Sequence, residues 1–206
     1  MRRTTGNRSL TLDETQTEET VERRANFRIQ TVMRIGHISV GYDEGLVLIK
    51  NLSDHGARLR IGFPLRLGDV LTLALSEDEP IRARVMWSQG KECGLRFDDK
   101  INCMDMLSQL SVSDWQRSNR PLRLNVSKPA LVRCEAGLLL AAVEDISHRG
   151  MKIRHDGRLT KHMVVKVTLP SGIARTGVVR WSRENLAGVL LLERFCAEDL
   201  GSSRAL

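Results

Sequence analysis

A short polar motif in the first half of the chain has residue types that suit hydrogen bonding to a ligand. Asn51, Ser53 and Gly56 stand where one apolar run ends and the next begins. Asn51 and Ser53 are two residues apart, so on a β-strand their side chains share one face. An amide beside a rotatable hydroxyl can hydrogen-bond the edge of a flat heterocycle. Gly56 is expected to take a positive φ or to permit the close approach of a ligand.

The same motif occurs a second time in the chain. It recurs 94 residues later as Asp145, Ser147 and Gly150, and the same shift places Trp87 on Trp181 without a gap. One register that preserves a turn, a tryptophan and the strands between them predicts two copies of one β-domain. A tight β-turn kept only for its shape explains the second copy of the motif equally well.

A dense basic cluster precedes the first apolar run. Arg24 and Arg28 are four residues apart, and Arg23 is adjacent. Guanidinium groups bind phosphate bidentately and stack on flat rings such as guanine. Alone, this cluster would be a solvated basic patch. Together with the polar motif it predicts a clamp for a guanine nucleotide.

Short strands broken by turn residues must position these side chains. Between Ile81 and Trp87, apolar residues alternate with Arg82 and Arg84, which marks a half-buried strand. Trp87 and Trp181 fall on the apolar faces of their strands and are expected to pack in the core. Strands in the first half are expected at about 29–40, 45–51, 56–61, 69–75, 81–88 and 93–97. This spacing indicates a small antiparallel barrel or sandwich.

The order of these patterns divides the chain into domains. Apolar residues at three- and four-residue spacing predict an amphipathic helix over about 99–116. We expect a flexible tail, a first β-domain with its helix, a second β-domain and a C-terminal tail, over residues 1–21, 22–116, 117–200 and 201–206.

Composition favours an anionic partner. The formal charge of +7 and the pI near 9.7 would attract a nucleic acid, a nucleotide or an acidic surface. No apolar run approaches the roughly twenty residues of a membrane span, and no apolar core of a signal peptide follows the first arginines. We therefore expect a cytoplasmic protein without membrane insertion.

The residues that could support catalysis or bind a metal are arranged unfavourably for either. The four cysteines form no C-x-x-C pair, so we expect no disulfide, no zinc site and no other metal. Ser53, Asp54 and His55 are neighbours in sequence, and neighbours on a strand or turn point apart, so they cannot form a hydrolase triad. We expect no enzyme and no cofactor.

The two motifs together resemble the signature of the PilZ family, whose domains bind cyclic di-GMP in bacterial second-messenger signalling. Arg24-x-x-x-Arg28 is followed by Asn51-x-Ser53-x-x-Gly56 in that family's order. The resemblance implies two consecutive six-stranded antiparallel β-barrels, with a short helix after the first. It also implies that Arg24 and Arg28 clamp the ligand, with Arg23 as an auxiliary, and that Asn51, Ser53 and Gly56 contact it from the barrel.

The second copy departs from the family pattern. Asp145, Ser147 and Gly150 are present, but the shift of 94 puts Ser118 and Leu122 where the two arginines of the signature stand. Arg117, Arg120 and Arg123 lie nearby at spacings of three, which is not the family spacing. We therefore expect the second barrel to be degenerate and to bind the ligand weakly or not at all, unless these arginines substitute, and to serve as a packing partner or a surface for a downstream protein.

These patterns support three hypotheses. The first is a non-enzymatic cyclic di-GMP receptor that couples binding to rearrangement between its barrels or with an unidentified downstream protein. The second is a basic β-barrel that binds nucleic acid, which the eight aromatic residues in 206 disfavour because stacking platforms need exposed rings. The third is a ligand-free scaffold for protein interaction.

Overall fold

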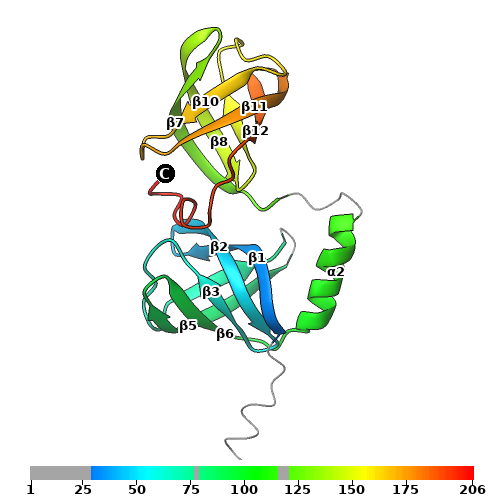
Figure 1. Cartoon of the computed structure of the whole chain (residues 1–206). Helices are drawn as coiled ribbons and strands as arrows, with labels where there is room; N and C mark the ends of the chain where they lie inside the picture. The colour runs from blue at the N-terminus through cyan, green and yellow to red at the C-terminus, as the bar shows by residue number, and fades with distance from the viewer. Residues whose placement is uncertain (1–28, 77–78, 116–120) are drawn as a thin grey trace, which may run out of the picture.

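The computed structural model describes residues 29–76, 79–115 and 121–206 (Figure 1). Arg23, Arg24 and Arg28 lie outside the described residues. The described elements are β1 (Ile29–Val40), β2 (Asp43–Ser53), β3 (Gly56–Arg60), β4 (Val70–Ala74), β5 (Pro80–Gln89), β6 (Glu92–Phe97), α2 (Cys103–Trp115), β7 (Leu124–Cys134), β8 (Gly137–Ser147), β9 (Gly150–Arg154), β10 (Val164–Thr168), β11 (Ala174–Arg183) and β12 (Leu186–Leu191).

Each half of the chain closes into a six-stranded antiparallel barrel (Figure 1). In the first barrel the neighbours run β1-β2-β3-β6-β5-β4, and β1 pairs with β4 to close the ring. The second barrel has the same order from β7 to β12, closed by β7 and β10. Closure leaves none of the twelve described strands at an open sheet edge. The prediction of two consecutive barrels with one helix after the first is confirmed.

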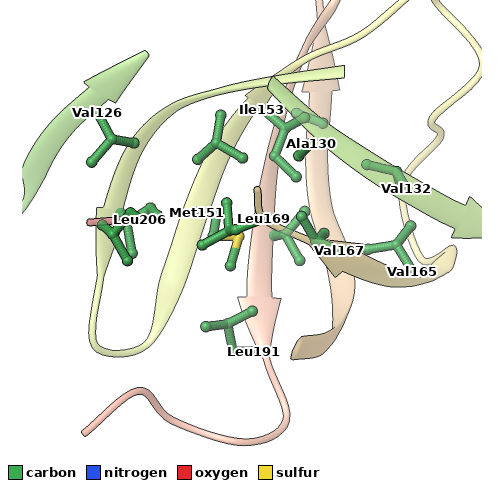
Figure 2. Close-up of a cluster of buried hydrophobic side chains, with 14 of the residues drawn as sticks. Val126, Ala130, Val132, Met151, Ile153, Val165, Val167, Leu169, Leu191 and Leu206 are labelled. Carbon is green, nitrogen blue, oxygen red and sulfur yellow. The ribbon is translucent and has the colours of Figure 1, made fainter. Parts of the chain in front are cut away.

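Alternating burial along the strands builds each core. In β5, Ile81, Ala83 and Val85 are buried while Arg82 and Arg84 are exposed, as the sequence pattern predicts. Figure 2 shows the corresponding interior of the second barrel, where aliphatic side chains from β7, β9, β10 and β12 point toward one another. Burial of such side chains contributes about 1.5–3 kcal/mol each and stabilises the barrels.

The first strand of each barrel bends at a β-bulge. The pairing register shifts between Gln30 and Arg34 in β1, and between Asn125 and Lys128 in β7. Each bulge contains a non-glycine residue with a φ of 44°. The bulge in β1 is one residue longer than the bulge in β7, so residues before the two bulges correspond at a shift of 95 rather than 94.

The C-terminal residues 198–206, which we call the C-terminal strap, lie between the two barrels (Figure 1). The backbone N–H of Leu46 donates to Leu200 O at 2.8 Å, and the N–H of Ser203 donates to Glu44 O at 2.7 Å. These two bonds tie the strap to the start of β2. The strap therefore joins the second barrel to the first through the backbone.

Side chains reinforce this attachment. Asp43 accepts hydrogen bonds from the hydroxyls of Ser202 at 2.6 Å and Ser203 at 3.1 Å. Burial opposes ionisation of Asp43, but the bonds from these hydroxyls and from backbone N–H groups outweigh it and lower the pKa of the carboxyl. At the end of the strap, Leu206 lies in the core of the second barrel (Figure 2).

Among the described residues, no helix has the length and apolar content to span a membrane. Within the same ranges, no group of three or more His, Cys, Asp or Glu side chains is arranged to hold a metal ion.

Candidate functional site

The first motif occupies the corner between β2 and β3. Ser53 pairs with Gly56 across the turn, and Asn51 pairs with Arg58 after a register shift in β2. The hydroxyl of Ser53 donates to Gly56 O at 3.1 Å. Leu52 is buried in the core while Asn51 and Ser53 on either side of it are half-buried, so the two polar residues lie on the opposite face, as their spacing predicts. Both line one surface cavity.

Gly56 is required by backbone packing. A Cβ at this position would lie far inside 3.0 Å of the carbonyl oxygen of Leu95, on the neighbouring strand β6. Its φ is not positive, so that part of the expectation is wrong. The close approach of a ligand stays a prediction, and the group that approaches Gly56 in this structure is the β6 backbone.

The cavity beside this corner has a volume of about 310 Å³. It is lined by residues of β2, β3, β5 and β6 and of the motif turn, namely Asn51, Leu52, Ser53, His55, Gly56, Ala57, Arg58, Met86, Trp87, Gly94 and Leu95. Its wall combines an amide, a hydroxyl, a guanidinium and an indole. Such a surface can hydrogen-bond and stack on a flat polar ring.

The expectation that Trp87 packs in the core is wrong. Its side chain is 41% exposed and lines the cavity. The β5–β6 register shifts between Val85 and Trp87. Because of this bulge, the indole faces outward and not inward like Val85 and the alternate residues before it. The indole lies against Gly94, where a Cβ would collide with it. Trp181 is placed in the same way on the second barrel and is 40% exposed.

Arg58 also lines the cavity, and the sequence patterns did not single it out. Its guanidinium carbon lies 5.8 Å from the centre of the Trp87 ring. Glu92 holds Arg58 in place by accepting from its Nε at 2.9 Å, and it also accepts from Lys50 Nζ at 2.5 Å. The bonds from Lys50 and Arg58 lower the pKa of Glu92. Only the bulge geometry reveals that Arg58 and Trp87 meet.

The turn of the motif also anchors helix α2. The carbonyl of His55 accepts from Phe97 N at 2.8 Å, and the carbonyl of Asp54 accepts from Ile101 N at 2.9 Å. The Asp54 carboxylate accepts from the first N–H of the helix, that of Cys103, at 3.2 Å. Hydrogen bonds from the thiol and backbone of Cys103 lower the pKa of Asp54. A change in the conformation of this turn would therefore alter the hydrogen bonds at the start of α2.

The predicted arginine clamp precedes the first described strand. Ile29, which follows Arg28 directly in the chain, pairs with Leu52 in the middle of the motif. The chain therefore enters the first barrel at the cavity. The positions of Arg23 and Arg24 relative to the cavity stay predictions.

The second motif forms the equivalent corner of the second barrel. Ser147 pairs with Gly150 across the turn between β8 and β9, and both line a cavity of about 240 Å³. Ser147 is 1% exposed, and its hydroxyl oxygen accepts from Gly150 N at 3.1 Å. Asp145 forms an ion pair with Arg123.

The pairing register changes which residues of the two barrels correspond. Ile29 pairs with Leu52, and Leu124 pairs with Ile146, at matching places in the two motifs. Arg123, which precedes Leu124, therefore corresponds in sequence to Arg28, which precedes Ile29. The ungapped shift of 94 matched Leu122 to Arg28, because it ignored the shorter bulge of β7. Asn119 corresponds in the same way to Arg24, and it lies outside the described residues.

Comparison with known proteins finds a domain family whose model matches both halves of the chain. The PilZ domain model matches residues 22–109 and 116–196. No curated protein matches the chain in sequence. Similar solved structures include PlzA of Borreliella burgdorferi in complex with c-di-GMP. It is 10% identical in sequence, the match covers 86% of this chain and 92% of that chain, and the TM-score is 0.38. The Bacillus subtilis inhibitor of motility MotI/DgrA matches at 12% identity, 84% and 92% coverage and a TM-score of 0.31. YcgR of Escherichia coli in complex with c-di-GMP matches at 11% identity, 88% and 80% coverage and a TM-score of 0.27.

Proposed function

We propose that this chain, which belongs to the PilZ domain family, is a cyclic di-GMP receptor that binds its ligand at the first barrel. The observation that carries the proposal is the convergence of Asn51, Ser53 and Trp87 on one cavity. Cyclic di-GMP is the ligand that the family resemblance implies. It presents flat guanine rings and charged phosphates, which are the two chemistries that this wall and the preceding arginines can bind.

Each group of the cavity has a distinct part in this proposal. The amide of Asn51 and the hydroxyl of Ser53 hydrogen-bond the edge of a guanine. The half-exposed indole of Trp87 supplies a stacking surface, and Arg58 beside it adds a cation. Arg24 and Arg28 bind phosphate oxygens bidentately, with Arg23 as an auxiliary. Gly56 allows β3 to approach β6 and so shapes the cavity floor.

The output of binding is proposed to be a rearrangement rather than a reaction. The Asp54 carboxylate is bonded to the backbone of Cys103, so it does not serve as the acid of a triad with His55. The same turn holds the start of α2, and β2 runs from the motif to the C-terminal strap at Glu44 and Leu46. Ligand contacts at the turn can therefore bias both the helix and the packing of the barrels. A downstream protein would read that change.

Isothermal titration with cyclic di-GMP tests the proposal. We expect wild-type protein to bind with micromolar or tighter affinity, and Arg24→Ala and Ser53→Ala to abolish the heat signal. Arg133→Ala is the matched control, because Arg133 is an exposed arginine on β7 outside the cavity. Absence of binding by folded wild-type protein, or unchanged binding by both site variants, would refute the proposal.

A further inference from the structure

The second barrel carries a cavity that differs from the first in its charge. By the shift of 94, its wall of Ser147, Gly150, Trp181 and Gly188 corresponds residue for residue to the first cavity. Four cationic side chains also line it, contributed by four separate segments: Arg123, Arg149, Lys152 and Arg180. Among the residues that the structure describes, the wall of the first cavity includes a single arginine, Arg58, and no lysine.

Two of these cations replace residues of different chemistry in the first copy. Arg149 stands where His55 stands, and Arg180 stands where Met86 stands. Both arginines are exposed, and neither forms an ion pair within the part of the chain that the structure describes. Lys152, by contrast, is paired with Glu144 at 2.8 Å. The cavity therefore presents two uncompensated guanidinium groups.

The motif side chains of this corner are already engaged within the protein. Asp145 is paired with Arg123, and it is Arg123 rather than Asp145 that lines the cavity, whereas Asn51 lines the first cavity. The Ser147 hydroxyl accepts from the N–H groups of its own turn. The counterparts of Asn51 and Ser53, which are proposed to hydrogen-bond the edge of a base in the first cavity, are thus occupied by bonds within the protein in the second. Cationic side chains line the wall there instead.

We propose that the second cavity is a separate site for a phosphate monoester with a flat ring, that is, a mononucleotide. Arg149 and Arg180 would bind the phosphate dianion, since guanidinium groups match phosphate oxygens bidentately. Trp181, half exposed with its indole against Gly188, would stack on the ring. Because Asp145 is paired with Arg123, this wall lacks the base-edge contact that Asn51 offers to a guanine of cyclic di-GMP in the first cavity. This inference stands on the second barrel alone and does not depend on the ligand of the first.

Tryptophan fluorescence tests the proposal with GMP as the probe. Titrating Trp87→Phe protein leaves Trp181 as the cavity reporter, and Trp181→Phe protein is the companion that reports on the first cavity. Trp115 is present in both variants and contributes the same background. We expect saturable quenching by GMP in the former and none in the latter. Guanosine, which lacks the phosphate, and ribose 5-phosphate, which lacks the ring, should each bind more weakly than GMP. Equal binding of GMP and guanosine would overturn the role of the cations, and equal binding of GMP and ribose 5-phosphate would overturn stacking.

A double variant sharpens this test because it uses residues that the first copy already carries. Arg149→His with Arg180→Met should weaken GMP binding by roughly tenfold or more, since each charged hydrogen bond is strong. Arg133→Met is the matched control for loss of an exposed arginine and should bind as the parent does. Unchanged affinity in the double variant, or no saturable GMP binding in the parent, would contradict the proposal. The proposal would also be contradicted if each chain bound two equivalents of cyclic di-GMP and the double variant lost one of them.

Discussion

Replacing Gly56 by alanine should damage the first barrel more than the equivalent change damages the second. The added Cβ would fall far inside 3.0 Å of the Leu95 carbonyl oxygen, which belongs to the backbone and cannot rotate away. The β3–β6 ladder must open by about an ångström, which weakens roughly two backbone hydrogen bonds at about 1 kcal/mol each. We expect Gly56→Ala to lower the free energy of unfolding by about 2–3 kcal/mol.

Two other alanine substitutions calibrate this effect. At Gly150 the Cβ would lie 2.8 Å from Val189 O, so a shift of a few tenths of an ångström relieves it, and the expected cost is about 1 kcal/mol. Gly90 has a φ of +58° and open space around its Cβ, so alanine there carries backbone strain alone, also about 1 kcal/mol.

Differential scanning calorimetry of the three variants measures the comparison. A domain of this size loses several degrees of melting temperature per kcal/mol, so Gly56→Ala should fall clearly below the other two. Equal losses in Gly56→Ala and Gly90→Ala would refute the claim that contact with the β6 backbone is what requires glycine in the motif.

Three further predictions concern the strap, the indole and the thiols. The pKa of the Asp43 carboxyl is lowered in the folded protein. Its ionised form therefore stabilises the fold at pH values above the ordinary pKa of 3.8, and this stabilisation is lost as the pH falls below 3.8. Asp43→Asn should therefore cost about 1–3 kcal/mol at neutral pH and progressively less in acid, measured by urea unfolding. Trp87→Ala should weaken cyclic di-GMP binding by roughly 5- to 150-fold in titration calorimetry, the range of base–aromatic stacking. Burial raises the pKa of Cys93 to about 12 and of Cys103 to about 11, so a thiol reagent at neutral pH should leave both unmodified in native protein.

Strand alternation was predictable from sequence because burial follows a period of two wherever the ladder is regular. Arg82 and Arg84 alternate with buried neighbours, and the pattern alone places them outside. The same rule failed at Trp87, where a bulge adds one residue to β5 and reverses the facing of the residues after it. No residue type in that stretch marks the bulge.

The correspondence between the two copies failed for a related reason. A shift of 94 aligns every residue after the first bulge, but the bulge in β7 is one residue shorter, so it misplaces the residues before it. The shift therefore matches Leu122 to Arg28, and it leaves Arg123 as one of three nearby arginines without an assigned counterpart. The contacts of the C-terminal strap also escaped prediction, because backbone groups of Glu44, Leu46 and Leu200 make them irrespective of residue type.

The most direct test of the central proposal is an amide NMR titration of isotopically labelled protein with cyclic di-GMP. The proposal predicts large, saturable shifts for Ser53, Gly56 and the Trp87 indole N–H, with smaller shifts at the start of α2. The amides of Ser147 and Gly150 should stay unchanged. Shifts confined to the second corner, or no shift at either corner at saturating ligand, would contradict it.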